Sequence, residues 1–222
     1  MELVQEFWHF ITHLNQSLPA FISEHGNLVY ALLFAIIFVE TGFVIMPFLP
    51  GDSLLFVAGS LAAGSNASLD LATLFFLLFI AAVLGDNINY WVGRFFGPRI
   101  VKWRTFGRDL VQQKHLDKTH AYFEKYGVKT IIIARFVPIV RTITPFVAGI
   151  GAMDYRKKFL PFDIAGGALW ISSMLMAGYA FGTHPWIQAH FEAVVIGIVG
   201  ISVLPMIIEY IRQRRGGNTS AA

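Results

Sequence analysis

Long apolar stretches, interrupted by short polar segments, run through most of the chain. The clearest of them cover residues 28–39, 69–84, 162–181 and 193–208. Several approach the roughly 20 residues that an α-helix needs to cross a hydrocarbon core about 30 Å thick. The pattern predicts an all-α polytopic membrane protein, with spanning helices expected over residues 69–93, 159–182 and 193–211.

The composition supports this class of protein. The 222 residues are 55% hydrophobic and 14% charged, whereas a soluble domain carries about 25% charged residues. The chain has no cysteine, which excludes disulfides, iron–sulfur sites and thiol chemistry. The pI of about 9.2 does not predict a nucleic-acid partner, because an excess of Lys and Arg in a membrane protein reports its topology.

Basic residues are distributed unevenly along the chain. All 17 Lys and Arg residues lie at or after Arg94. Apart from Arg135 and Arg141, they fall into three groups. These groups occupy residues 94–129, 156–158 and 212–215. The positive-inside rule assigns all three to the cytoplasm, together with the C-terminal tail of residues 212–222.

This assignment constrains how the apolar segments cross the membrane. Residues 131–153 lie between two cytoplasmic groups, so we expect them to enter and leave on one face as a re-entrant hairpin. The following helix then crosses outward to the loop THPWIQAHFE, which has no Lys or Arg. By the same logic, residues 34–64 form a hairpin that enters from outside. The N-terminus is expected outside, with residues 1–27 as an amphipathic interfacial segment.

Two short strings occur twice in the same order. FVAG stands at residues 56–59 and 146–149, and the pattern G-x-x-F-G stands at residues 93–97 and 178–182. The first G-x-x-F-G precedes a basic segment and the second precedes an uncharged one, so the two copies are expected to point in opposite directions. Inverted repeats with broken helices are an architecture of secondary transporters.

The repeat predicts how the domain is organised. We expect a single transmembrane domain over residues 28–215. Its expected parts are repeat one at 28–97, a basic cytoplasmic loop at 98–130, repeat two at 131–182 and a last spanning helix at 193–211. Helix-breaking residues precede each FVAG, and they are Pro47, Pro50, Gly51, Pro138 and Pro145. Non-helical backbone at membrane depth occurs only where protein or a water-filled cavity surrounds it.

The two predicted hairpins carry opposite charges. Glu40 and Asp52 lie in the first, and Arg135 and Arg141 lie in the second. Acids within a membrane are candidates for proton relay, and arginine offers a planar fork of donors that matches a phosphate group. The four residues are therefore predicted to act in proton coupling and in binding an anionic headgroup. The alternative is that they form structural ion pairs that hold the hairpins in register.

Further polar residues lie at the inner end of one predicted spanning helix. Asp86, Asn87, Tyr90 and Arg94 either line the cavity or settle helix packing, and the sequence leaves both interpretations open. Asp163 is expected at the membrane interface. Asp52 follows Pro50-Gly51, so it is also a candidate N-cap residue for the next helix. The sequence predicts no metal site and no cofactor.

Taken together, these motifs resemble the bacterial DedA family of the SNARE-associated or VTT-domain superfamily. The matching strings are FVETGFVIMPFLPGDSLLFVAG, GDNINYWVGR, ARFVPIVRTITPFVAG, GALW and GYAFG. The resemblance implies a multi-pass inner-membrane protein with two opposed re-entrant hairpins. It also implies that the functionally required acids and arginines are the four residues in the predicted hairpins. The family is associated with moving lipids across the bilayer, with the proton-motive force and with envelope integrity.

We therefore expect a lipid flippase or scramblase for an anionic lipid phosphate, such as undecaprenyl phosphate or a phospholipid. The expected partners are membrane lipids and protons or a small cation, and the sequence is compatible with a homo-oligomer. One alternative is a proton-coupled antiporter of small cations or drugs. Another is a scaffold for envelope assembly that transports nothing. No nucleophile–base pair or nucleotide-binding loop is evident, so an enzyme is not expected.

Overall fold

The structure is a computed structural model in which most of the helical region is placed. It describes residues 22, 24–43, 51–63, 67–100, 104–105, 108–109, 127–182, 184–190, 193–194 and 197. Within these residues the fold is helical except for a two-stranded pair, β1 (Arg104–Thr105) and β2 (Arg108–Asp109), which run antiparallel. The predicted all-α class is confirmed, with this small pair as its exception.

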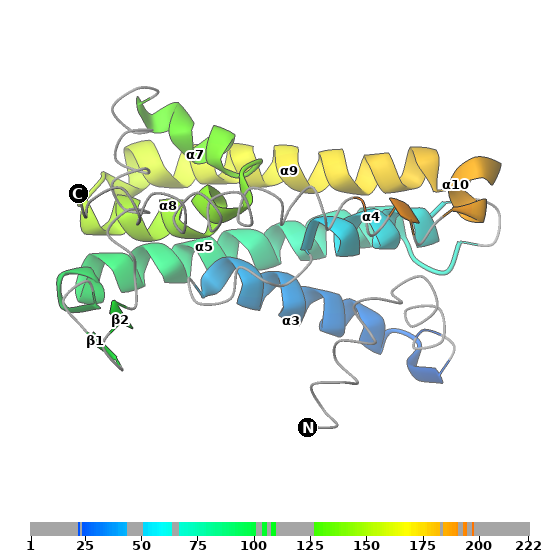
Figure 1. Cartoon of the computed structure of the whole chain (residues 1–222), viewed down its shortest axis with the longest axis horizontal. Helices are drawn as coiled ribbons and strands as arrows, with labels where there is room; N and C mark the ends of the chain where they lie inside the picture. The colour runs from blue at the N-terminus through cyan, green and yellow to red at the C-terminus, as the bar shows by residue number, and fades with distance from the viewer. Residues whose placement is uncertain are drawn as a thin grey trace, which may run out of the picture.

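Two long apolar helices form the framework. They are α5 (Leu71–Ile100) and α9 (Leu160–Phe181), and α9 continues from a short π-helical turn, η2 (Tyr155–Phe159). Their apolar stretches, Leu71–Gly97 and Tyr155–Phe181, each have 27 residues. At 1.5 Å per residue each is about 40 Å long, enough to cross a bilayer with some tilt. Figure 1 shows α5 and α9 packed side by side and running in opposite directions.

The start of α5 is fixed by the side chain of Asp70. Asp70 Oδ2 accepts a hydrogen bond from the backbone N–H of Thr73 at 2.7 Å, as an N-cap does. Hydrogen bonds from the Thr73 side chain and backbone hold the pKa of this exposed carboxyl below its usual value. The Asp70 N–H donates to the Tyr30 hydroxyl at 2.8 Å, which ties the helix to its neighbour α3.

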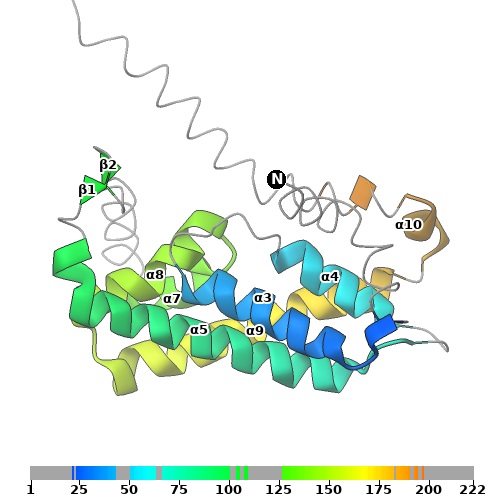
Figure 2. The same cartoon turned by 90° about the horizontal axis from the view of Figure 1, so that it is seen from below.

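Two groups of shorter helices flank this framework. The first consists of α3 (Leu28–Gly42) and α4 (Gly51–Leu61). The second consists of η1 (Gly127–Lys129), α7 (Thr130–Ala134) and α8 (Pro138–Ile150). In Figures 1 and 2, α3 and α4 lie toward the beginning of α5, whereas α7 and α8 lie toward its other end.

The main apolar core lies between α3, α4, α5 and α9. Its fully buried side chains include Leu33, Leu55, Leu74 and Trp170, one from each helix. A smaller cluster joins α5 to α7, α8 and η2. Its buried members are Tyr90, Ile131, Ala148 and Phe159. On the outside of α5 and α9, large apolar side chains are exposed, as expected of surfaces that face lipid. They include Phe76, Ile80, Leu84, Leu169 and Met176.

The first FVAG string lies where α4 crosses α9. A Cβ atom on Gly59 would overlap the Leu175 carbonyl oxygen, and one on Gly178 would overlap the Phe56 carbonyl oxygen. Glycine at both positions lets the two backbones approach closely, which is how small residues act in membrane helix packing. Gly178 begins the second G-x-x-F-G string. The two repeated motifs therefore contact each other at this crossing.

The second FVAG string makes the corresponding contact where α8 crosses α5. A Cβ atom on Gly149 would overlap the Tyr90 carbonyl oxygen, and one on Gly93 would overlap the Phe146 carbonyl oxygen. Gly93 begins the first G-x-x-F-G string. The first FVAG helix, α4, thus packs on the second G-x-x-F-G, and the second FVAG helix, α8, packs on the first. The phenylalanine and the glycine of FVAG make the contact in both cases.

Some local predictions need correction. Pro145 does not break a helix, because α8 runs through it from Pro138 to Ile150. A single missing N–H is tolerated in a membrane helix whose neighbours pack closely around it. Residues 185–189 form a short helix, α10 (Pro185–Ala189), inside the segment expected to be a loop. Asp52 is not the N-cap of α4, because this helix already begins at Gly51.

Other predictions agree with the structure or fall outside it. Pro138 opens α8 and Gly51 opens α4, so both lie at helix starts as expected. Pro47 and Pro50 lie outside the described residues. So do most of the N-terminal segment, most of the last predicted spanning helix and the C-terminal tail.

Candidate functional site

The first ionic centre is built around Arg141, and we name it the Arg141 centre. This arginine, on α8, binds Glu40 of α3 through Nη2 and Asp52 of α4 through Nη1, the latter at 2.9 Å. Trp170 of α9 donates its indole N–H to Asp52 Oδ1 at 2.9 Å, and its ring lies 4.5 Å from the Arg141 guanidinium carbon. Residues from four helices therefore meet at one cation.

The helix ends explain why Glu40 can be buried here. Glu40 lies in the last turn of α3 and is 1% exposed. Its carboxyl group lies against Gly51, where any Cβ atom would overlap it, and it receives a hydrogen bond from the Gly51 backbone. Gly51 is the first residue of α4. The positive end of the α4 dipole therefore adds to the attraction of Arg141 for this carboxylate.

The second ionic centre is built around Arg135, and we name it the Arg135 centre. Arg135 follows α7, and its Nη2 binds Asp86 of α5 and Asp163 of α9, the latter at 2.5 Å. All three side chains are buried. Asp163, expected from the sequence at the membrane interface, is buried within the protein and 1% exposed. The helical path begins at Tyr155, which places Asp163 about 12 Å along it at 1.5 Å per residue.

Two glycines of α9 make room for the Arg135 side chain. A Cβ atom on Gly166 would lie 3.2 Å from Arg135 Cδ and Nε, and one on Gly167 would lie 3.5 Å from Arg135 Cζ. The guanidinium group therefore rests on a surface of α9 that has no side chains. The two glycines of FDIAGGALW therefore allow the Arg135 side chain to lie directly against α9.

The two centres share a charge imbalance. Four carboxyl groups surround two guanidinium groups, so the network carries two negative charges when all six groups are ionised. The centres also interact with each other, because Asp86 interacts electrostatically with Arg141. Two uncompensated charges in a buried network are costly. Protons or cations are the species that would balance them.

The residues that follow Asp86 on α5 act mainly in packing contacts. Asn87 donates to the Val83 carbonyl at 2.6 Å and accepts from the Tyr155 hydroxyl, and the Tyr90 hydroxyl donates to the Met153 carbonyl at 2.6 Å. Arg94 is exposed. Asn89, one turn away from Asp86, donates to the carbonyl of Thr142 at 2.8 Å and so joins α5 to α8.

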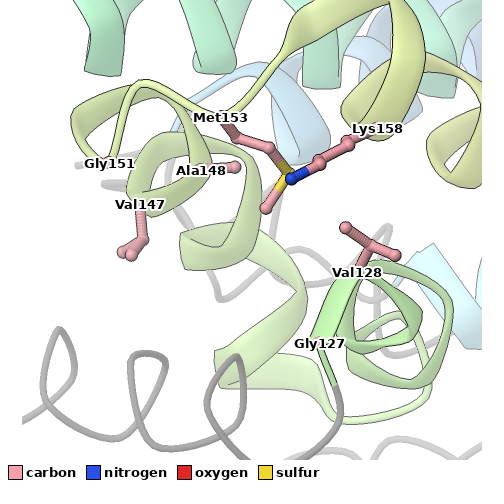
Figure 3. Close-up of a pocket in the computed structure, with 7 residues that line it drawn as sticks. All are labelled: Gly127, Val128, Val147, Ala148, Gly151, Met153 and Lys158. Atoms are coloured by element: carbon pink, nitrogen blue, oxygen red, sulfur yellow. The ribbon is translucent and has the colours of Figure 1, made fainter.

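A cavity of about 310 Å³ opens near the end of α8, away from both ionic centres. Figure 3 shows Val147 and Ala148 of α8 on one side and Val128 on the other, with Met153 and the Lys158 amine between them. None of Asp86, Asn87, Tyr90 or Arg94 lines it. Among the described residues, the lining combines apolar walls with one ammonium group, which suits an amphipathic anion.

The sequence and the structure agree on part of this site. The sequence left open whether the four predicted residues pair with one another or act on a ligand, and in the structure Arg141 binds both Glu40 and Asp52 directly. Arg135 instead binds two acids of the long helices. Asp163 and Trp170 were missed as site residues. An acid within an apolar helix is itself a signal of function, and this signal was available for Asp163.

Comparison with known proteins places this geometry in a family. The VTT domain model matches residues 49–180. The chain is 45% identical over 221 residues to protein DedA of Escherichia coli K12, covering the full length of both chains.

More distant relatives are membrane proteins by name. A membrane protein of Mycobacterium tuberculosis is 39% identical over 190 residues, covering 86% of this chain and 82% of the relative. The E. coli inner membrane protein YghB is 33% identical over 171 residues, covering 76% of this chain and 75% of the relative. No solved structure matches the chain. The two apolar helices and these similarities agree, and the chain belongs to the VTT-domain family as a DedA-like membrane protein.

Proposed function

We propose that this protein is a transporter of the inner membrane that moves an anionic lipid phosphate across the bilayer in steps linked to protonation. The observation that carries this proposal is the Arg141 centre. A guanidinium group offers the planar donors that suit phosphate, and here it lies where α3, α4, α8 and α9 meet. Asp52 is 15% exposed, so this end of the centre is the more accessible one.

The carboxylates set the condition for binding an anion. Glu40 and Asp52 both bind Arg141, so a phosphate group must replace one of them. A carboxylate that takes up a proton loses its ionic attraction to the guanidinium, whereas arginine stays charged. Protonation of Glu40 or Asp52 therefore frees donors for the phosphate. By linkage, binding of the lipid then favours uptake of the proton to the same extent.

The repeated helix crossings support the transporter architecture in this proposal. The α4–α9 and α8–α5 crossings use the same glycines of the repeated motifs. We interpret α3–α4 and α7–α8 as opposed re-entrant hairpins of an inverted repeat, with the ionic centres between them. Alternating access in such folds arises when one repeat moves against the other around a fixed site.

The cavity near α8 provides a place for the lipid to arrive. It lies beside η2, whose sequence YRKKF carries three basic residues that the positive-inside rule assigns to the cytoplasm. In this proposal Lys158 attracts the phosphate, and the apolar walls contact the first part of the lipid chain. The headgroup then passes to Arg141.

Purified protein in liposomes tests this function directly. Labelled polyprenyl phosphate and labelled phospholipid are placed in separate vesicle preparations, and their movement between leaflets is measured with and without a pH gradient. We expect the lipid phosphate to move and Arg141→Gln to slow it about tenfold or more, because a charged hydrogen bond contributes about 1.5–3 kcal/mol. Arg94→Gln is the matched control, since Arg94 is exposed. Absence of movement of either lipid would refute the proposal.

A second candidate is a proton-coupled antiporter of small cations. The excess of carboxyl groups over guanidinium groups favours it, because an acidic network binds cations and protons in competition. In the same liposomes, this activity appears as cation-dependent decay of a pH gradient without movement of lipid. That result would replace the first proposal by the second.

A further inference from the structure

We propose that Asp86 and Asp163 share one bound proton beside Arg135, which makes them a proton-binding site separate from Glu40 and Asp52. The proposal goes beyond lipid transport, because a proton on this pair does not depend on which substrate the protein carries. It assigns a function to two acids that lie on the long helices rather than on the short ones.

The first argument is the arrangement of charge around the pair. Asp86 and Asp163 both bind Arg135 Nη2, so two carboxyl groups meet at one nitrogen. The two carboxyl groups also interact electrostatically with each other. A hydrogen bond between two carboxyl groups requires a proton, because an ionised carboxylate only accepts hydrogen bonds. Two like charges so close together are relieved when one proton is shared.

The second argument is that polar atoms of the pair remain without donors. Asp86 Oδ1 and Asp163 Oδ2 are buried and receive no hydrogen bond from any residue that the structure describes. The two residues are 2% and 1% exposed. An unpaired buried carboxylate oxygen is costly, and a proton taken up by the pair removes one of the two charges that these oxygens carry.

The third argument is that no described cation other than the two arginines balances the pair. From α8, Arg141 interacts with Asp86, but it already binds Glu40 of α3 and Asp52 of α4. The face of α9 beneath the guanidinium consists of two glycines and presents no charge. Among the described elements packed on the pair, these are the charged groups that face it. One proton leaves the Arg135 centre electrically neutral.

Infrared spectroscopy of the full-length protein in lipid nanodiscs tests the shared proton. The C=O stretch of a protonated carboxyl group is measured near neutral pH, and aspartate carrying a heavy carbon isotope at its carboxyl group distinguishes aspartate from Glu40. We expect both Asp86→Asn and Asp163→Asn to lose the same protonated-aspartate band, because either change leaves one ionised carboxylate paired with Arg135. Asp70→Asn is the control, since Asp70 is exposed and its pKa is lowered.

Each outcome decides the proposal. Loss of the band in both variants supports a shared proton, and its persistence in an Asp52→Asn background assigns it to this pair. Retention of the band in either variant overturns the proposal. The proposal also predicts that each single variant melts close to the wild type, whereas the double variant melts lower by about 6 °C or more, because Arg135 then has no anion. If one variant does not fold, the isotope measurement on the wild type and on the other variant still decides.

Discussion

Removal of the Arg141 charge tests whether the centre is a structural ion pair or a functional site. In Arg141→Met, Glu40 and Asp52 lose their common cation, and Glu40 is 1% exposed. Breaking a buried ion pair by removing one partner costs about 3–5 kcal/mol, because the other charge remains buried without compensation. We therefore expect the free energy of unfolding at neutral pH to fall by about that amount.

A second variant separates charge from packing in this experiment. The triple change Arg141→Met, Glu40→Gln and Asp52→Asn removes all the charges of the centre while keeping its volume nearly constant. Replacing a whole buried ionic group by uncharged residues is often neutral or stabilising, so the triple variant is expected to regain most of the loss. The same variant is expected to be inactive in the liposome assay, because it has neither the guanidinium fork nor the titratable acids.

The assay is equilibrium unfolding of the purified protein in mixed micelles, with helix content followed by circular dichroism. Arg94→Met is the matched control, because Arg94 is exposed and surface changes usually fall within about 0.5 kcal/mol. Wild-type stability in Arg141→Met would contradict the assignment of a buried ion pair. A triple variant no more stable than the single one would show that packing, rather than charge, explains the loss.

Three further predictions concern helix contacts and the cavity. Gly178→Ala forces α9 away from the Phe56 carbonyl oxygen and is expected to lower the free energy of unfolding by about 1–3 kcal/mol. Gly197→Ala, where no atom of the described residues lies within 4 Å of the added Cβ, should leave the free energy of unfolding unchanged in the same titration. Gly166→Ala pushes against Arg135 Cδ at 3.2 Å and is expected to lower the melting temperature measured by circular dichroism. Lys158→Gln removes the ammonium group of the cavity and is expected to weaken the binding of lipid phosphate by the protein in nanodiscs about tenfold. Binding of an uncharged polyprenol should not change. Equal binding of the lipid phosphate by variant and wild type would show that Lys158 is not on the route.

The Arg141 centre was accessible from sequence for a specific physical reason. The positions of the basic groups and the repeated strings predicted two hairpins that enter the membrane from opposite faces. One hairpin carries Glu40 and Asp52, and the other carries the two arginines. Opposite charges in an apolar environment then have to meet. In the structure, Arg141 binds both acids.

The Arg135 centre was not accessible in the same way. Its partners, Asp86 and Asp163, lie on α5 and α9, and their approach depends on how these two helices pack side by side. Hydropathy locates a helix along the chain but does not give its rotation. Asp163 was expected at the interface, and its pairing with Arg135 was not foreseen because a partner on another helix cannot be identified from hydropathy. Pro145 shows a similar limit, since proline propensity does not include the neighbouring helix that stabilises α8.

The two arginines have different partners, which suggests that they have different roles in transport. The acids of the Arg141 centre come from α3 and α4, the helices that we interpret as a re-entrant hairpin, and Asp52 is partly exposed. The acids of the Arg135 centre come from the two long helices and are fully buried. If the short helices rearrange while α5 and α9 stay packed together, contacts between the short helices change more than contacts within the long-helix framework. Arg141 is therefore the cation suited to exchange a carboxylate for a phosphate. Arg135, with a proton retained between its two aspartates, is suited to keep α7 on the framework while that exchange takes place.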